Sequence, residues 1–178
     1  MLTLRELVYL EAEVTEEIEK LGQVCSILQG KGFFDRATAE RKLVDEVILR
    51  GVAGMLQDYY SGVERIFKRI AVEVDERLPK GESWHKALLH QMKVDIPGIR
   101  PKVISTSTYE KLDELRSFRH RVGNIYGFNL IPERLVNHLL SLPELDNSFR
   151  SDIRSFFEAM KGALKNRLKN AGKPERTP

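Results

Sequence analysis

Apolar residues recur at steps of three and four along most of the chain, the spacing that lines one face of an α-helix. The first stripe consists of Leu7, Leu10, Val14, Ile18, Leu21, Cys25 and Leu28. The segment GKGFFD at 30–35 should end this helix, because glycines and an aspartate follow the last apolar position. We find no sustained alternation of apolar and polar residues, so the pattern predicts helices and no β-sheet.

A second stripe keeps one phase over residues 35–78, and its members are Val44, Ile48, Val52, Met55, Tyr59, Val63, Ile66, Ile70 and Val74. A straight helix of that length would span roughly 60 Å, which is long for a compact domain of this size. We therefore expect a kink or break and place it at Gly51 and Gly54. Tyr59 and Tyr60 should pack in the core, with one hydroxyl reaching solvent.

Two helices are predicted between residues 78 and 123. Ser83 ends the turn LPKGES and should cap a short helix, whose apolar residues are Trp84, Leu88 and Met92. Ser107 and Glu110 have the spacing of a capping box and should start the next helix. The core-facing residues of that helix are Leu112, Leu115, Phe118 and Val122. Gly123 should end or distort it.

Two further helices complete the predicted fold. Pro132 suits the first turn of a helix that runs to about Leu142, where Pro143 should stop it. A last helix from about Asp146 carries Phe149, Ile153, Phe156, Met160 and Leu164 on one face. The pattern as a whole predicts an all-α protein with one helical domain over residues 1–170 and a flexible basic tail over residues 171–178.

The composition fits a soluble globular protein. The 178 residues are 42% hydrophobic and 31% charged, which makes disorder an unlikely state for most of the chain. No apolar run approaches the roughly 18 residues that a membrane span needs, and the N-terminal segment is acid-rich, unlike a basic leader. We therefore expect a cytoplasmic protein without a membrane association.

The formal net charge is only +3, but positive charge gathers near the C-terminus. From residue 161 onward the cations are Lys161, Lys165, Arg167, Lys169, Lys173 and Arg176, against the single acid Glu175. Such a segment can follow a phosphate backbone. It is equally explained as a solvated helix end whose cations interact favourably with the helix dipole.

Cysteine and histidine spacings give no metal or cofactor site. Cys25 is the only cysteine, so it cannot form an intramolecular disulfide, and we expect it in the core. His85 and His90 lie five residues apart, which does not suit a shared metal, and His138 has no candidate ligand beside it. We expect structural roles for these histidines, no bound metal and no cofactor.

The strongest candidate for chemistry is the segment RSFRHRVGNIYGF at 116–128. Residues four apart share a helix face, so Arg116, His120 and Asn124 form one stripe, while Arg119 leads toward Tyr126 on the next. These stripes supply guanidinium groups for phosphate, an imidazole, an amide and a phenol. RNA phosphodiester cleavage requires a base, an acid and a cation, so this set fits it.

The segment YEKLDELRSFRHRVGNIYGFNLIPERL resembles the motif region of HepT-like ribonuclease toxins of the HEPN superfamily. Their signature is an arginine, four to six residues, a histidine, one residue and a tyrosine. The resemblance extends to VERIFKRIAVEVDERLPKGESWHKALLHQM. It implies an antiparallel helical bundle, commonly a homodimer that brings two motif helices together, and an RNA substrate. Because no metal-ligand cluster is visible in the sequence, we expect cleavage without a metal.

Alignment with the signature gives Arg119 and Tyr126 their expected places, but the position of the catalytic histidine is occupied by Asn124. An amide neither gains nor loses a proton near neutral pH, so Asn124 can hold a phosphate or ribose but cannot be a base. His120 is the nearest imidazole in the sequence, and a dimer can present it to the same cleft. We therefore name Arg116, Arg119, His120, Asn124 and Tyr126 as candidate catalytic residues.

Three hypotheses remain open from the sequence. The protein is an active ribonuclease in which His120 is the base and Arg116 or Arg119 binds the phosphate. Alternatively, it is a weakened relative that retains RNA binding, dimerisation or pairing with a nucleotidyltransferase antitoxin, which in this family can attach AMP to the motif tyrosine, here Tyr126. The third hypothesis is a helical interaction module whose arginines pair with Asp113 and Glu114.

Overall fold

The computed structural model describes residues 2–124 and 130–171, apart from the side chains of residues 120–124 and 170–171. Six helices follow one another in this part of the chain: α1 (Leu4–Gly30), α2 (Arg36–Lys42), α3 (Glu46–Glu73), α4 (Trp84–Met92), α5 (Thr106–Asn124) and α6 (Pro132–Ala171). No β-strand occurs among the described residues, where one isolated antiparallel bridge joins Ile96 and Arg100. The predicted all-α class is confirmed.

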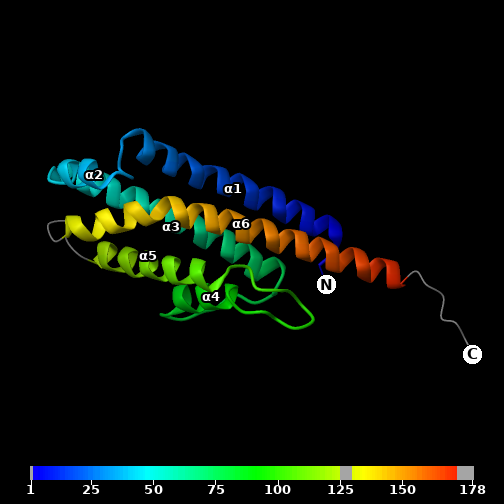
Figure 1. The fold of residues 1–178 in the computed structure, drawn as a ribbon. Helices are drawn as coiled ribbons and strands as arrows, with labels where there is room; N and C mark the ends of the chain where they lie inside the picture. Colours follow the sequence, from blue (N-terminus) through cyan, green and yellow to red (C-terminus); the bar gives the residue numbers. More distant parts are fainter. Residues whose placement is uncertain (1, 125–129, 172–178) are drawn as a thin grey trace, which may run out of the picture.

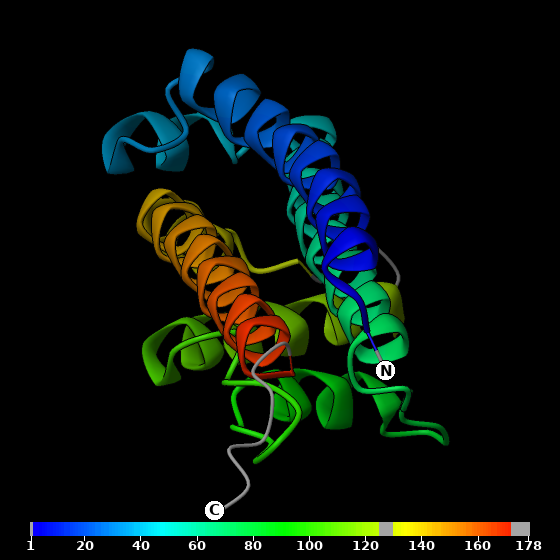
Figure 2. The ribbon, with the colours of Figure 1, turned by 90° about the vertical axis from the view of Figure 1, so that its right-hand side faces the viewer.

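The three long helices α1, α3 and α6 form an elongated bundle, and α4 and α5 lie along one side of it (Figures 1 and 2). Helix α1 packs against α3 and α6, whereas α5 packs against α3, α4 and α6. Followed from blue to red in Figure 1, α1 runs opposite to α3 and α6, and α5 also runs opposite to both. Helices α1 and α5 are thus antiparallel to α3 and α6, as expected for a helical bundle.

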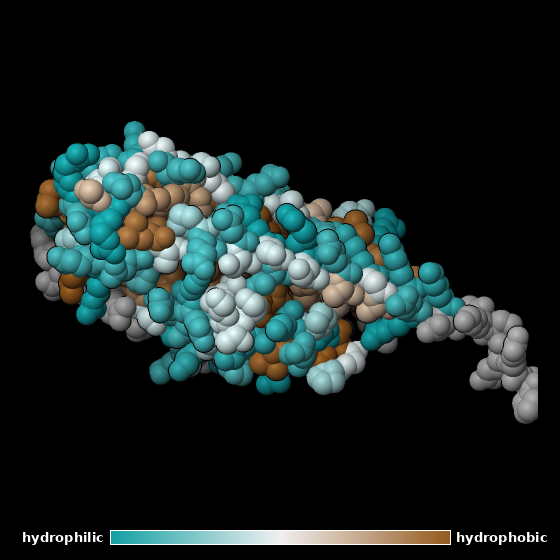
Figure 3. Space-filling model, viewed as in Figure 1, coloured by the Kyte–Doolittle hydropathy of each residue, from teal (hydrophilic) through white to brown (hydrophobic). Residues whose placement is uncertain are grey.

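The outer face of the bundle is mostly hydrophilic, with small, separated hydrophobic patches in the view of Figure 3. This is the surface expected when each helix turns its apolar stripe inward. Within the described ranges, none of the helices combines the length and the apolar character needed to cross a membrane.

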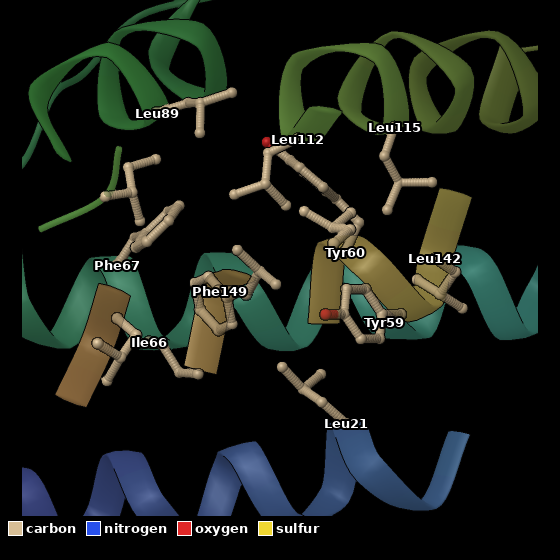
Figure 4. Packing of buried hydrophobic residues seen from close by; sticks show 14 of the residues in the cluster. Leu21, Tyr59, Tyr60, Ile66, Phe67, Leu89, Leu112, Leu115, Leu142 and Phe149 are labelled. Carbon is tan, nitrogen blue, oxygen red and sulfur yellow. The ribbon is translucent and has the colours of Figure 1, made fainter. Parts of the chain in front are cut away.

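The core forms around α3, the central helix of the close-up in Figure 4. Leu21 approaches α3 from α1 on one side, while Leu89 of α4 and Leu112 of α5 approach it from the other side (Figure 4). At Gly62 the contact with α1 is so close that an added Cβ would overlap the Leu21 side chain. The absence of a side chain at Gly62 therefore sets how near α1 can approach.

The long second stripe breaks, but not at the predicted place. Helix α3 runs without interruption through Gly51 and Gly54, and the break falls at residues 43–45 between α2 and α3. The Asp45 side chain accepts hydrogen bonds from the backbone N–H groups of Val47 and Ile48, which starts α3 there. Val44, counted in the predicted stripe, is 83% exposed because it lies in the connection.

The starts of α4 and α5 differ from the predicted caps. Ser83 does precede α4, but its side chain makes no capping hydrogen bond. Helix α5 is capped by Ser105 instead of Ser107, because the Ser105 hydroxyl accepts from the Thr108 backbone N–H at 3.2 Å. Asp152 of α6 accepts from the Ser105 backbone N–H and the Thr108 hydroxyl, so the start of α5 is attached to α6.

Pro143 does not stop a helix, contrary to the sequence prediction: α6 is one helix of 40 residues that contains it. Proline removes one backbone hydrogen bond inside a helix, at a cost of about 3 kcal/mol or more. Leu139, Leu142, Leu145 and Phe149 are buried on both sides of Pro143. We attribute the continuity of α6 to this burial, which offsets the lost bond.

Candidate functional site

A buried acid connects three helices at the side of the bundle where α4 and α5 lie. Glu64 of α3 is only 4% exposed. One of its carboxylate oxygens accepts from Nη1 of Arg119 on α5 at 2.5 Å, and the other is in close contact with Nδ1 of His85 on α4. We call Glu64, His85 and Arg119, together with the neighbouring Tyr60, the Glu64 cluster.

Local structure explains why these side chains meet. Tyr60, Glu64 and Phe67 recur at steps of four and three, so all three lie on the buried face of α3 that α4 and α5 cover. His85 is the second residue of α4, after a turn in which Gly81 has a φ of 92°. Arg119 directly follows the buried Phe118 on α5, and it is the last residue of this helix whose side chain the structure describes.

The imidazole of His85 is oriented by Glu64 and is open to solvent. Its Nδ1 faces the carboxylate, so a proton on Nδ1 is donated to Glu64 and the lone pair is left on Nε2. The side chain is 33% exposed, and none of the described residues forms a hydrogen bond with Nε2. The ring packs on Trp84 at a centroid distance of 3.6 Å, and Nζ of Lys68 lies 4.3 Å from the Trp84 ring.

The guanidinium of Arg119 is held at one end and accessible at the other. Nη1 donates to Glu64 and lies 3.5 Å from Nδ1 of His85. The side chain is 32% exposed, and the other guanidinium nitrogens make no hydrogen bond to the residues that the structure describes. The guanidinium carbon also lies 5.8 Å from the centre of the Tyr60 ring. Arg119 therefore retains donors that can pair with the oxygens of an anion such as phosphate.

Tyr60 contributes a buried hydroxyl for which no hydrogen-bond partner exists among the described residues. Burial, and next the negative charge of Glu64, raise the pKa of Tyr60 well above its usual value, while the charges of Arg116 and Arg119 act in the opposite direction. The Tyr60 hydroxyl is therefore a neutral group at physiological pH. Neither of the adjacent tyrosines has the predicted exposed hydroxyl, since Tyr59 donates to Asp146 inside the core.

The structure brings only part of the predicted site together. Arg119 belongs to the Glu64 cluster, whereas Nε of Arg116 donates to Asp113 at 2.7 Å, as the interaction-module hypothesis expects for that arginine. His120 and Asn124 are part of the helical backbone of α5, but their side chains lie outside the described residues. Tyr126 lies outside them altogether. Their proposed roles therefore remain predictions.

The other candidate residues occupy structural positions. Cys25 is partly buried against the core, and its burial, with a smaller contribution from Asp146, raises the pKa of its thiol to about 12. His90 lies edge-on to Tyr109 and His138 lies against Phe118. In the described ranges no group of three or more histidine, cysteine, aspartate or glutamate side chains is arranged to hold a metal ion.

Sequence reasoning missed both Glu64 and His85. A usable signal was present for Glu64, because it falls on the buried stripe of α3, four residues after Tyr60 and three before Phe67. A charged residue on an apolar face is rarely buried without a charged partner. His85 had no comparable signal, since the turn that brings α4 back onto α3 cannot be derived from its neighbours.

Comparison with known families gives one match. The model of the HepT-like protein family, HepT-like_2, matches residues 51–160. The matched segment includes most of α3, all of α4 and α5, and all members of the Glu64 cluster. No curated protein and no solved structure matches the chain significantly.

Proposed function

Because this chain belongs to the HepT-like HEPN family, we propose that it is the toxin of a toxin–antitoxin pair and cleaves RNA in the cytoplasm without a metal ion. The observation that carries the proposal is the Glu64 cluster. It holds a guanidinium and an imidazole next to each other, both about one third exposed, over a buried carboxylate.

The chemistry of the cluster suits a phosphodiester. Arg119 is neutralised by Glu64, yet it has unused donors that can bind the non-bridging oxygens of a phosphate. Nζ of Lys68, near Trp84, adds positive charge beside the cluster. Arg116 is paired with Asp113, and we assign it to the edge of the site, where it contributes to the local potential without a specific contact.

RNA cleavage by the purified protein tests the proposal directly. We expect cleavage of a labelled single-stranded RNA in the presence of EDTA, with a 2′,3′-cyclic phosphate on one product. Arg119→Ala should lower the rate at least about a hundredfold, the scale for losing a group that stabilises charge in the transition state. Arg5→Ala is the matched control, because Arg5 is an exposed arginine of α1, a helix that contributes no residue to the Glu64 cluster. Inert wild-type protein, or EDTA-sensitive cleavage, would contradict the proposal.

The asparagine at the motif histidine position separates an active enzyme from a weakened one. If the site lacks its base, Asn124→His should create or raise RNA cleavage, since Arg119 and Tyr126 stand at the family spacing. If another imidazole in the same protein is the base, Asn124→His should change the rate little. His120→Ala, measured in parallel, tests whether the neighbouring imidazole is that base; it should then lose at least about a hundredfold in rate.

We further propose that two copies of the chain associate through residues 107–128. Each copy supplies one set of Arg119, His120 and Asn124, and a dimer would place two sets at one cleft. Sedimentation should then give twice the chain mass at micromolar concentration. A monomer that cleaves RNA at full rate would contradict this assembly.

The antitoxin partner that we propose is a small nucleotidyltransferase that attaches AMP to Tyr126. If the neighbouring reading frame encodes such an enzyme, incubation with it and ATP should add one AMP per chain and stop RNA cleavage. Tyr126→Phe should prevent the modification. An unmodified chain that cleaves RNA would contradict the antitoxin proposal alone. A wild-type chain that is neither modified nor able to cleave RNA would favour the alternative function, a non-catalytic module for dimerisation or for binding RNA or protein, which the Arg116–Asp113 pair also supports.

A further inference from the structure

We infer that His85 is the proton-transfer residue of the Arg119 site and that Glu64 is its positioning residue. The inference rests on the proposed function, since it names the group that performs the chemistry at the same site. It differs from the expectation based on the sequence, in which Asn124 occupies the place of the motif histidine and His120 is the candidate base. His85 belongs to a different helix, α4, and lies outside the motif.

The first support is the fixed orientation of the ring. Nδ1 of His85 contacts a carboxylate that is 5% exposed, and Trp84 packs on the ring face at 3.6 Å. A buried carboxylate that accepts from Nδ1 holds the proton on that nitrogen and directs the lone pair of Nε2 outward. The ring is thus fixed by its Nδ1 side, while a third of the side chain remains exposed for contact with a ligand.

The second support is the position of the guanidinium. Nη1 of Arg119 lies 3.5 Å from Nδ1 of His85, and both groups share the Glu64 carboxylate. A phosphate bound to the unused donors of Arg119 therefore lies on the same side of α3 as the His85 ring. Tyr60 is excluded from the same role, because the residue is only 1% exposed and burial raises the pKa of its hydroxyl well above the usual value for tyrosine.

The reaction can proceed with this one imidazole. Nε2 of His85 accepts the proton of the ribose 2′-hydroxyl while the 2′ oxygen forms a bond to phosphorus. The bond between phosphorus and the 5′ oxygen then breaks, and the imidazolium returns the proton to that leaving oxygen. The products are a 2′,3′-cyclic phosphate and a 5′-hydroxyl, and the protein regains its initial protonation state. Arg119 balances the charge that develops on the non-bridging oxygens.

The test compares His85→Ala and His85→Asn with wild type in single-turnover RNA cleavage. Asparagine is the informative variant, because its amide nitrogen can still donate to Glu64 but cannot serve as a base or an acid at neutral pH. Both variants should lose at least about a hundredfold in rate. Affinity for an RNA with a 2′-methoxy group at the cleavage position should change by less than about threefold, and free imidazole should restore part of the rate in His85→Ala. The control is His90→Ala, which changes an exposed histidine of the same helix and should cleave at the wild-type rate.

A second measurement reads the ring directly and does not depend on RNA. In ¹⁵N spectra of the histidine rings, His85 should carry its proton on Nδ1, and Glu64→Gln should keep that tautomer, because the amide oxygen of glutamine still accepts from Nδ1. Glu64→Ala should lose it. A proton on Nε2 in wild type would overturn the proposed geometry.

The two proposals fail in different ways. If wild type cleaves RNA and His85→Asn does so at a similar rate, His85 is not the proton-transfer residue, and the proposed function stands. If wild type binds or ignores RNA but never cleaves it, the proposed function is wrong and the role of His85 falls with it. Loss of cleavage in His85→Asn, together with unchanged RNA affinity and an unchanged unfolding transition, supports the inference.

Discussion

Two acid–arginine pairs adjoin α3 and differ in how completely the arginine is used. Arg100 pairs with Asp75, just beyond the end of α3, and their side chains are 0% and 2% exposed. Nε and Nη2 of Arg100 donate to the carboxylate, and its remaining bonds go to the carbonyls of Val94, Pro101 and Gln91. All five guanidinium donors are thereby satisfied. Arg119 gives Glu64 one donor and is 32% exposed.

The comparison separates a structural ion pair from a candidate functional one. The Asp75–Arg100 pair fixes the loop between α4 and α5, because the donors of Arg100 are directed to that loop, to the last turn of α4 and to Asp75 just after α3. Nothing in such a pair is available to a ligand. The Glu64 cluster has the opposite character: its acid is buried, but its cation and imidazole retain unused groups. Burial of the acid without complete use of its partners is the feature that makes the second pair a candidate site.

Removal of Arg100 should have the largest effect on stability. Arg100→Ala leaves Asp75 buried without its cation, so we expect a loss of about 3–5 kcal/mol in the free energy of unfolding. Arg119→Ala should cost clearly less, because Glu64 keeps His85 and the site is partly solvated. Denaturant unfolding of the two variants measures both effects. Equal losses would mean that the two pairs do not differ in the way we describe.

For RNA binding the order should reverse, and removal of Arg119 should have a larger effect than removal of Arg100. With an RNA that cannot be cleaved, Arg119→Ala should weaken binding about tenfold, the scale of one charge-assisted hydrogen bond. The slope of log affinity against log salt should fall by about 0.7, as for one phosphate contact on a single strand. Arg5→Ala is again the matched control. An unchanged slope in Arg119→Ala would show that this arginine does not contact the phosphate.

The adjacent tyrosines repeat the comparison on a smaller scale. Tyr59→Phe removes a hydroxyl that donates to Asp146 at 3.1 Å and should destabilise the protein by about 1 kcal/mol. Tyr60→Phe removes a buried hydroxyl without a partner among the described residues, so it should be neutral or stabilising by up to about 1 kcal/mol. Thermal unfolding of both variants gives the sign. A destabilised Tyr60→Phe protein would reveal a partner for that hydroxyl.

The smallest expected effect is a difference in how the two ion pairs respond to salt. Screening weakens exposed charge interactions much more than buried ones. The destabilisation caused by Arg119→Ala should therefore shrink between 0.1 M and 1 M sodium chloride, while that caused by Arg100→Ala should stay within the error of the measurement. If both values fall in parallel, the Asp75–Arg100 pair is more accessible to ions than its 0% and 2% exposure implies.

The helices were largely predictable, and their junctions were less so. The apolar stripes of α1 and α5 follow from local periodicity, and Leu7, Leu21, Leu112 and Phe118 are buried as expected. The break between α2 and α3 depends on Asp45, whose capping bonds are local, whereas the prediction considered only the two glycines inside α3. The passage of α6 through Pro143 depends on tertiary burial, which a local rule cannot include.

The site was predictable only on α5. Arg119 could be named because cationic and polar residues crowd one end of that helix. Its partners come from α3, 55 residues earlier, and from α4, 34 residues earlier. Long-range pairing of this kind leaves no periodic trace in the sequence. Only the position of Glu64 on a buried stripe signals that a charged partner must come from another helix.

The most direct test of the Glu64 cluster as the functional site is to map RNA contacts by NMR. Backbone amide spectra recorded with a non-cleavable single-stranded RNA should show the largest shifts around Glu64, His85 and Arg119. The amides around Asp75 and Arg100 should stay in place, because that pair has no donor left for a ligand. Shifts confined to the cationic end of α6, or centred on Arg100, would contradict the assignment of the site.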